Sequence, residues 1–239
     1  MKSLLAFVLL TAAYQAIAAG GFAACPQFFY AGSPPAVQSK PAYRELCFES
    51  FAVLHNGDTR TPFYVAERLN KQVMADADEK RTNKFFAEAR LPNRERAELK
   101  DYAGSGYAKG HMAPAADMPT PTAMAQSFSL ANMVPQAPKS NSGAWAKIEK
   151  DTRRYVTRAQ GDVFVITGPA YGSAYLIIGD NQVRIPQYLY KLVYDPSRNK
   201  AWAYWQENKN DARATAPISY QELVRRTGIN YLPAADMLQ

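Results

Sequence analysis

One long helical pattern stands between two groups of strand-like segments, and this order limits the fold more than any other feature of the sequence. Over residues 141–159, apolar side chains recur at the three- and four-residue spacing of a helix. The stripe consists of Trp145, Ile148, Thr152 and Tyr155 with Val156. Another layer must cover such a stripe, and the flanking strands can supply that layer.

The strand-like segments alternate apolar and polar residues and end at turn signals. Residues 50–68 predict a hairpin around Asn56-Gly57-Asp58. His55 ends the first strand of this hairpin, where an exposed or half-buried side chain is expected. Four further strands are predicted after the helix, in the segments DVFVITGPAY, AYLIIGD, QVRIPQYLYKLVYD and NKAWAYWQEN.

The chain between the hairpin and the long helix is less regular. Residues 70–103 are polar and mixed in charge, which predicts a long surface excursion. The stretch YAKGHMAPAADM, residues 107–118, predicts an extended, turning loop, and residues 121–127 predict a short helix. A last short helix is ended by Gly228. The predicted fold class is α+β, with a mostly antiparallel sheet and the loop and long helix inserted between strand groups.

The N-terminus has the layout of a secretory signal peptide, which we assign to residues 1–18. Lys2 precedes a short apolar stretch, and Ala16-Ile17-Ala18 is a plausible cleavage site. The alternatives are a retained anchor helix and a lipoprotein modified at Cys25. The signal peptide predicts an exported protein, periplasmic or secreted, with no stable membrane association.

Two cysteines, Cys25 and Cys47, lie near the start of the mature chain. In an oxidising compartment an even pair most simply forms one disulfide, worth about 3 kcal/mol on the chain-entropy model. The pair would tie residues 19–47, a loop region rich in Pro, Ser and Gly, to the rest of a single domain over residues 19–239. The length and the 47% hydrophobic content suit one packed globular domain.

The formal net charge of +7 makes a polyanion such as nucleic acid a reasonable partner. Charge alone is a weak argument, because it fits equally an exported protein that binds an acidic surface polymer.

His111 is the residue best suited to chemistry, and several polar residues near it in sequence could assist it. Cutting a phosphodiester needs a base near neutral pH, a divalent cation with hard oxygen ligands, and cationic side chains for the transition state. The chain offers each type in His111, Lys109, Asn132, Asn141, Glu149, Arg153 and Arg81. The alternative is structural: a histidine that braces its loop, asparagines at a turn and a helix start, and a Glu149–Arg153 ion pair on a solvated face.

Three ordered motifs add to this interpretation: KGHMAPAADM, then ANMVPQ, then NSGAWAKIE. In this order and spacing they resemble the DNA/RNA non-specific endonuclease family, whose signature reads Asp-Arg-Gly-His, Asn-x-x-Pro-Gln and Asn-x-x-x-Trp-x-x-x-Glu. The resemblance extends from about Cys47 to Pro233. It implies a ββα-metal (His-Me finger) fold, one Mg²⁺ ion for which Mn²⁺ can substitute, DNA and RNA as substrates, and products with 5′-phosphate ends.

The resemblance also implies a role for each candidate residue. His111 is the general base, Asn141 the direct metal ligand, and Glu149 acts on the metal through water. Asn132 orients the histidine. Lys109, Arg81 and Arg153 hold the phosphate or the transition state.

The sequence departs from the family signature at one place, where Ala108-Lys109 stands for Asp-Arg. Lysine keeps the positive charge but lacks the planar, two-pronged donor geometry of arginine. The departure leaves a second hypothesis open, a catalytically weak or silent family member that binds nucleic acid.

Overall fold

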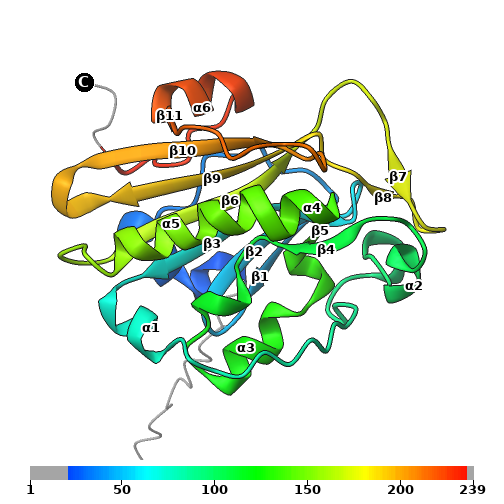
Figure 1. The fold of residues 1–239 in the computed structure, drawn as a ribbon, viewed down its shortest axis with the longest axis horizontal. Helices are drawn as coiled ribbons and strands as arrows, with labels where there is room; N and C mark the ends of the chain where they lie inside the picture. Colours follow the sequence, from blue (N-terminus) through cyan, green and yellow to red (C-terminus); the bar gives the residue numbers. More distant parts are fainter. Residues whose placement is uncertain (1–20, 236–239) are drawn as a thin grey trace, which may run out of the picture.

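A computed structural model describes residues 21–235, which are built around a seven-stranded sheet (Figure 1). The strands follow the order β1-β2-β3-β6-β9-β10-β11, and every neighbouring pair is antiparallel. Their bounds are Tyr43–Cys47 (β1), Phe51–Asn56 (β2), Thr61–Leu69 (β3), Val163–Ala170 (β6), Tyr188–Asp195 (β9), Lys200–Glu207 (β10) and Ile218–Ser219 (β11). The predicted hairpin is therefore β2–β3, and the prediction of an antiparallel sheet is confirmed.

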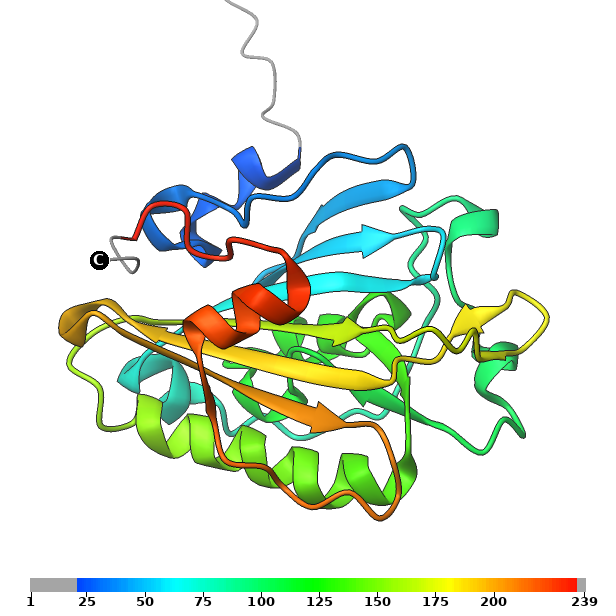
Figure 2. The same ribbon diagram turned by 90° about the horizontal axis from the view of Figure 1, so that it is seen from above.

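The centre of the sheet joins two strands that are distant in sequence. Strand β3 pairs with β6, with Leu69 opposite Val163, so the chain between them leaves the sheet and returns to it. The inserted chain includes α1 (Lys71–Asp76), α2 (Leu99–Tyr102) and a ββα unit. The long helix of that unit covers one face of the sheet, and α6 (Tyr220–Thr227) covers the other (Figure 2).

The ββα unit consists of β4 (Ala108–His111), β5 (Met133–Gln136) and a helix that follows at once. The helix begins as α4 (Pro138–Ser140), continues through a π turn over Asn141–Trp145 (η7) and ends as α5 (Ala146–Val156). The short helix α3 (Pro121–Ser127) has the predicted threonine cap, because the Thr120 hydroxyl accepts a hydrogen bond from the Ala123 N–H. Residues 108–111 are a paired strand rather than the predicted loop, since β5 supplies a partner that local sequence could not reveal.

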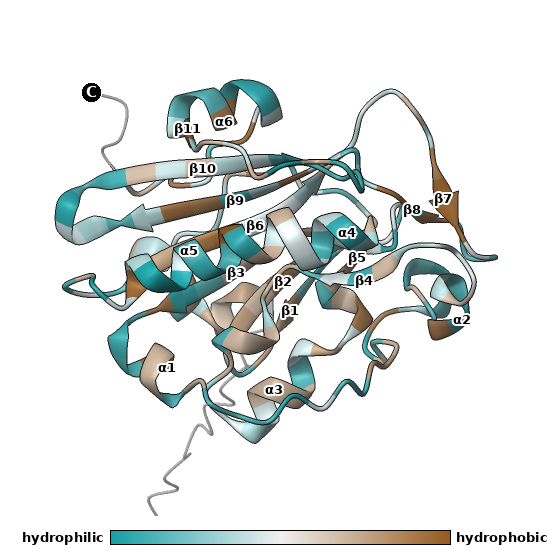
Figure 3. Ribbon diagram, in the orientation of Figure 1, coloured by the Kyte–Doolittle hydropathy of each residue, from teal (hydrophilic) through white to brown (hydrophobic). Residues whose placement is uncertain are grey.

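The amphipathic stripe of the helix explains why it packs on the sheet. Trp145, Ile148, Thr152 and Val156 are buried, whereas Lys147, Lys150 and Arg154 on the opposite face of the helix are exposed (Figure 3). Trp145 and Ile148 join a core with Val53 of β2 and Val65 of β3. This packing fixes the rotation of the helix and so decides which of its polar residues approach His111.

Two further sequence predictions are wrong. The segments AYLIIGD and QVR do not enter the main sheet, but form a separate hairpin of β7 (Ile177–Ile178) and β8 (Val183–Arg184). The hairpin is anchored to α2, where the Asp101 carboxylate accepts hydrogen bonds from the backbone and side chain of Asn181.

The second failure concerns His55, which is buried rather than exposed. It lies 2.6 Å from the Glu95 carbonyl oxygen, and burial lowers its pKa to about 4.

The N-terminal region is tied to the sheet as predicted. Cys25 and Cys47 form a disulfide with a Cα–Cα distance of 5.9 Å. Three short 3₁₀ turns lie before β1, over Gly21–Ala24, Pro26–Phe28 and Tyr30–Gly32. The predicted loop region therefore contains three short 3₁₀ turns, and Cys47 itself is the last residue of the edge strand β1. The predicted signal peptide lies outside the described residues, and none of the helices between residues 21 and 235 could cross a bilayer.

Candidate active site

The first strand of the ββα unit carries His111 at its end, and Gly110 allows it to lie close to its partner strand. A Cβ atom at Gly110 would stand 2.6 Å from the Cβ of Gln136 and would also collide with its Oε1. A real side chain cannot adopt such a contact without displacing one strand. The Gly-His pair is therefore a packing requirement as well as a motif.

His111 is buried among aromatic rings. Its imidazole meets the ring of Phe128 edge-on at 5.1 Å between centroids and lies 5.9 Å from Phe85. Burial, with a smaller contribution from the positive charge of Arg81, lowers the pKa of His111 to about 3. The imidazole is thus neutral at neutral pH and has one nitrogen free to accept a proton.

Two of the predicted cations lie on these same rings. The ammonium group of Lys109 is 4.8 Å from the centroid of Phe85. The guanidinium group of Arg81 is 5.1 Å from the centroid of Phe128. Cations over aromatic faces are held by the ring quadrupole without losing their charge. The structure thus brings Lys109 and Arg81 to the rings that surround His111.

Asn132 holds the loop after His111 rather than the imidazole itself. Its fully buried amide accepts a hydrogen bond from the Ala113 N–H and donates to the Ala113 and Ser127 carbonyl oxygens, each at 2.9 Å. The backbone carbonyl oxygen of Asn132 also accepts a hydrogen bond from the Met112 N–H at 3.0 Å. These bonds fix the two residues that follow His111.

Asn141 is the first residue of the π turn in the long helix, and Glu149 lies about two turns later, in α5. Asn141 is half-buried, and its side chain donates and accepts no hydrogen bond within residues 21–235. Burial, reinforced by the nearby Asp117 carboxylate, raises the pKa of Glu149 to about 7, while Lys191 and Arg153 act in the opposite direction. The Asn141 side chain therefore offers an oxygen atom that no described residue uses, whereas the Glu149 carboxyl lies among the charges of Lys191, Asp117 and Arg153.

Arg153 does not pair with Glu149, as the structural alternative required. Its Nη1 instead donates to Oδ1 of Asp117 at 3.0 Å. Asp117 is buried and follows His111 by six residues. The ion pair therefore links the helix to the far end of the histidine loop.

Sequence reasoning missed two buried titratable side chains near this ion pair, Lys191 and Glu67. Lys191 of β9 donates to the Thr167 hydroxyl at 2.7 Å and to the Met112 carbonyl oxygen at 3.4 Å. Glu67 of β3 is fully buried, and neither of its carboxylate oxygens has a hydrogen-bond partner in the described chain. Burial raises the pKa of Glu67 well above its usual value. A lysine within the apolar run YLYKLVY was the available sequence signal.

Comparison with known proteins assigns the family. The family model for DNA/RNA non-specific endonucleases matches residues 34–237. The chain belongs to this family. The solved structure of EndoG in a complex with EndoGI has the same fold, with a TM-score of 0.72 and 25% identity over 85% of this chain and 89% of that chain. The predicted ββα-metal nuclease fold is therefore confirmed.

Two human members of this nuclease family are similar in sequence. Human mitochondrial nuclease EXOG is 36% identical over 159 residues, covering 62% of this chain and 43% of the relative. Human mitochondrial endonuclease G is 32% identical over 156 residues, covering 61% and 52%. The match thus spans about half the length of these relatives.

The prediction of an exported, periplasmic or secreted protein is wrong by this comparison, because both human relatives are named as mitochondrial. Targeting segments are read by receptors, so an apolar stretch behind one lysine does not by itself specify the compartment.

Proposed function

We propose that this chain is a metal-dependent, sugar-non-specific endonuclease that hydrolyses DNA and RNA with His111 as general base. The observation that carries the proposal is the neutral imidazole of His111, enclosed by aromatic rings that also hold Lys109 and Arg81. A proton acceptor beside two cations suits attack on an anionic phosphodiester. Residues 19–239 act as one nuclease domain, which agrees with the extent of the family match.

In the proposed reaction, water attacks phosphorus and transfers a proton to His111. The Nε2 atom of His111 is buried, so we assign proton transfer to Nδ1. The bond from phosphorus to the 3′ oxygen breaks, and that oxygen takes up a proton from a solvent water and leaves as a hydroxyl, which gives a 5′-phosphate end. A bound phosphodiester adds negative charge, which raises the pKa of His111 toward the range where a base works well.

Mg²⁺ is the cofactor we propose, and Mn²⁺ should substitute for it. Asn141 would be the direct ligand, and Glu149 would act through water. The oxygen donors of these residues fit a hard cation that keeps several waters. The described residues contain no group of three or more His, Cys, Asp or Glu side chains positioned to hold a metal. When bound, the ion would neutralise charge on the phosphate.

The remaining site residues position the substrate or the loop. Lys109 and Arg81 would contact phosphate oxygens. Arg153 would also contact them, through the guanidinium N–H groups that do not donate to Asp117. Asn132 would keep His111 in place through Ala113.

A plasmid-nicking assay, repeated with RNA, tests the proposal. His111→Ala should abolish cleavage while the thermal unfolding curve stays two-state and close to that of the wild type. EDTA should stop cleavage, and Asn141→Ala should raise the Mg²⁺ concentration needed for half-maximal rate. Undiminished cleavage by His111→Ala would refute the assigned base, and full activity in EDTA would refute the metal.

The alternative is a weak or silent member of the family that binds nucleic acid. It predicts binding without cleavage by the wild-type chain in the same assay. Lys109 is its only specific support, and the ammonium group of Lys109 remains at the rings around His111.

A further inference from the structure

A groove on the side of α5 away from His111 combines positive charge with aromatic rings. It has a volume of about 630 Å³, within the ~300–1,000 Å³ range of ligand pockets. Its lining includes Arg154, Arg158, Lys200, Tyr155, Trp202 and the single carboxylate Asp151. None of the predicted catalytic residues lines it.

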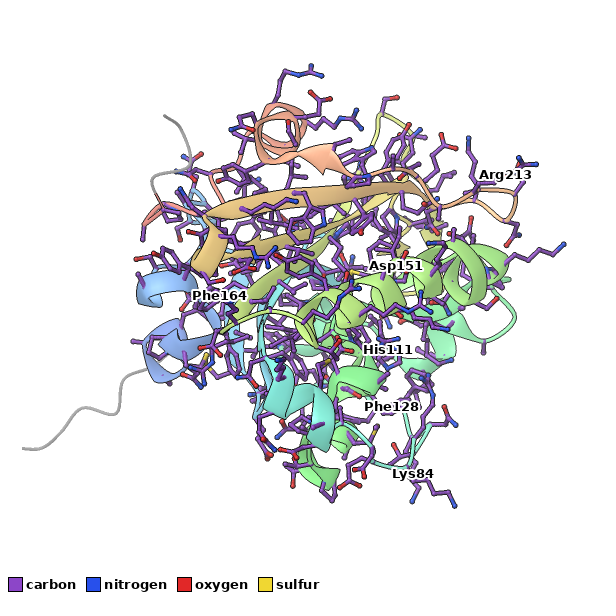
Figure 4. The ribbon with its side chains drawn as sticks, turned by 60° about the vertical axis from the view of Figure 1, so that its left-hand side comes forward. Lys84, His111, Phe128, Asp151, Phe164 and Arg213 are labelled. Carbon is purple, nitrogen blue, oxygen red and sulfur yellow. A yellow bond between two sulfur atoms is a disulfide. The ribbon has the colours of Figure 1, made fainter. Side chains whose placement is uncertain are left out.

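The geometry of α5 separates this groove from the active site. Successive helical residues are about 100° apart, so the buried Thr152 has Arg153 on one flank and Asp151 on the other. The active-site flank carries Glu149 and Arg153, and the groove flank carries Asp151 and Tyr155. Figure 4 shows His111 and Asp151 on opposite sides of the helix.

The charge of the groove is available to an anion. Asp151 pairs with Lys147 at 2.5 Å and with Arg154 at 3.5 Å, so its negative charge is already compensated. Arg158 and Lys200 are exposed and form no ion pair within the described residues. The groove therefore has an excess of positive charge.

The floor of the groove suits a flat ring. Trp202 of β10 is half-buried, with the ring of Tyr155 edge-on at 4.7 Å between centroids and the Lys200 ammonium group 5.6 Å from the ring centroid. Tyr155 is fixed by donating its hydroxyl proton to Asp195 at 2.6 Å. Cations along a groove that ends on a rigid aromatic ring are typical of sites for single-stranded nucleic acid.

Further cations connect the groove to the active site. The outward face of α5 carries Lys150, Arg154 and Lys147, which lie between the flank of Arg153 and the groove. A strand that leaves the active site can therefore cross α5 against positive charge throughout.

We propose that the groove between α5 and β10 is a second binding site for single-stranded nucleic acid, in which Arg154 and Arg158 hold phosphates and Trp202 stacks on a base. The ligand class rests on the proposed function. The site would tether long substrates and so favour them over short ones.

The test measures binding of a labelled single-stranded oligodeoxythymidylate to variants that all carry His111→Ala, so that binding is measured without cleavage. Arg154→Ala/Arg158→Ala should weaken binding about 25-fold at ~0.1 M salt and lower the slope of log K against log salt by about 1.4, as expected for two lost phosphate contacts. Trp202→Ala should weaken binding about tenfold, and Trp202→Phe should weaken it less. Saturating oligonucleotide should quench tryptophan fluorescence, and Trp202→Phe should lack that quenching.

Lys71→Ala/Arg225→Ala is the matched control, because it removes two exposed cations outside the groove. Binding of the oligonucleotide by the groove variants within twofold of this control would overturn the proposal. The proposal would also fail if the groove substitutions left oligonucleotide binding unchanged and weakened only the binding of a protein or of a lipid vesicle. Because every variant in the binding test carries His111→Ala, a negative result for the groove does not depend on whether the protein cleaves its substrate. With His111 restored, the groove variants should show a raised KM on long substrates, whereas failure of the proposed function would remove cleavage altogether.

Discussion

Asn132→Ala should destabilise the protein by about 3 kcal/mol and slow cleavage further than the loss of folded protein explains. The substitution removes three buried hydrogen bonds of 2.9 Å, and the Ala113 N–H and the Ala113 and Ser127 carbonyl oxygens lose their partner. Each buried polar group left unsatisfied costs about 1–3 kcal/mol, so three groups cost at least about 3 kcal/mol. The effect on rate follows because Ala113 lies two residues after His111.

Urea unfolding followed by tryptophan fluorescence measures the stability, and plasmid nicking below the unfolding transition measures the rate. Asn132→Asp keeps the shape but, when ionised, cannot donate to either carbonyl oxygen. Its stability should therefore rise relative to Asn132→Ala as the pH falls and the carboxyl gains a proton. Asn210→Ala is the control, since this exposed amide accepts one bond from the Lys139 N–H and its loss should cost below about 1 kcal/mol. A loss below about 1 kcal/mol for Asn132→Ala, with an unchanged rate, would refute the assigned role.

Three further predictions concern the residues around the site. Gly110→Ala should cost about 2 kcal/mol in urea unfolding, because the added methyl group overlaps Gln136. Glu67→Gln should become more stable than the wild type as pH rises, since burial raises the pKa of Glu67 in the folded state. The wild type keeps its full stability below the pKa that Glu67 has in the unfolded chain, and loses up to about 1.4 kcal/mol per pH unit above it. Equal pH profiles of the wild type and Glu67→Gln in urea unfolding would contradict the assignment. Lys109→Arg should raise kcat/KM about two- to tenfold, because a guanidinium group over Phe85 can bind phosphate with two donors; a lower value in the nicking assay would show that lysine is the better residue here.

Residue periodicity was enough to predict the elements that are defined by neighbouring residues or by a repeating pattern of apolar side chains. The β2–β3 hairpin, α3 with its Thr120 cap and the buried stripe of the long helix all follow from residue spacing. The disulfide followed from the number of cysteines. Strand β4 could not be predicted in this way, since the strand that pairs with it, β5, lies more than 20 residues further along the chain.

The candidate site divides along the same line. The motifs named His111, Asn132, Asn141 and Glu149 in order, because each residue keeps its own spacing within a short run of sequence. The buried Glu67 and Lys191 are contributed by strands β3 and β9 of the sheet, and the role of Asp117 became visible only through its contact with Arg153.

The sequence by itself determined which residues can accept a proton, bind a hard cation or contact a phosphate, because those properties belong to the side chains. Tertiary structure decided the surroundings in which they work. Phe85 and Phe128 enclose His111 and lower its pKa, and Asn132 fixes the loop rather than the imidazole. Burial and electrostatics depend on neighbours that are distant in the chain, and only the packing of the inserted segment on the sheet brings those neighbours together.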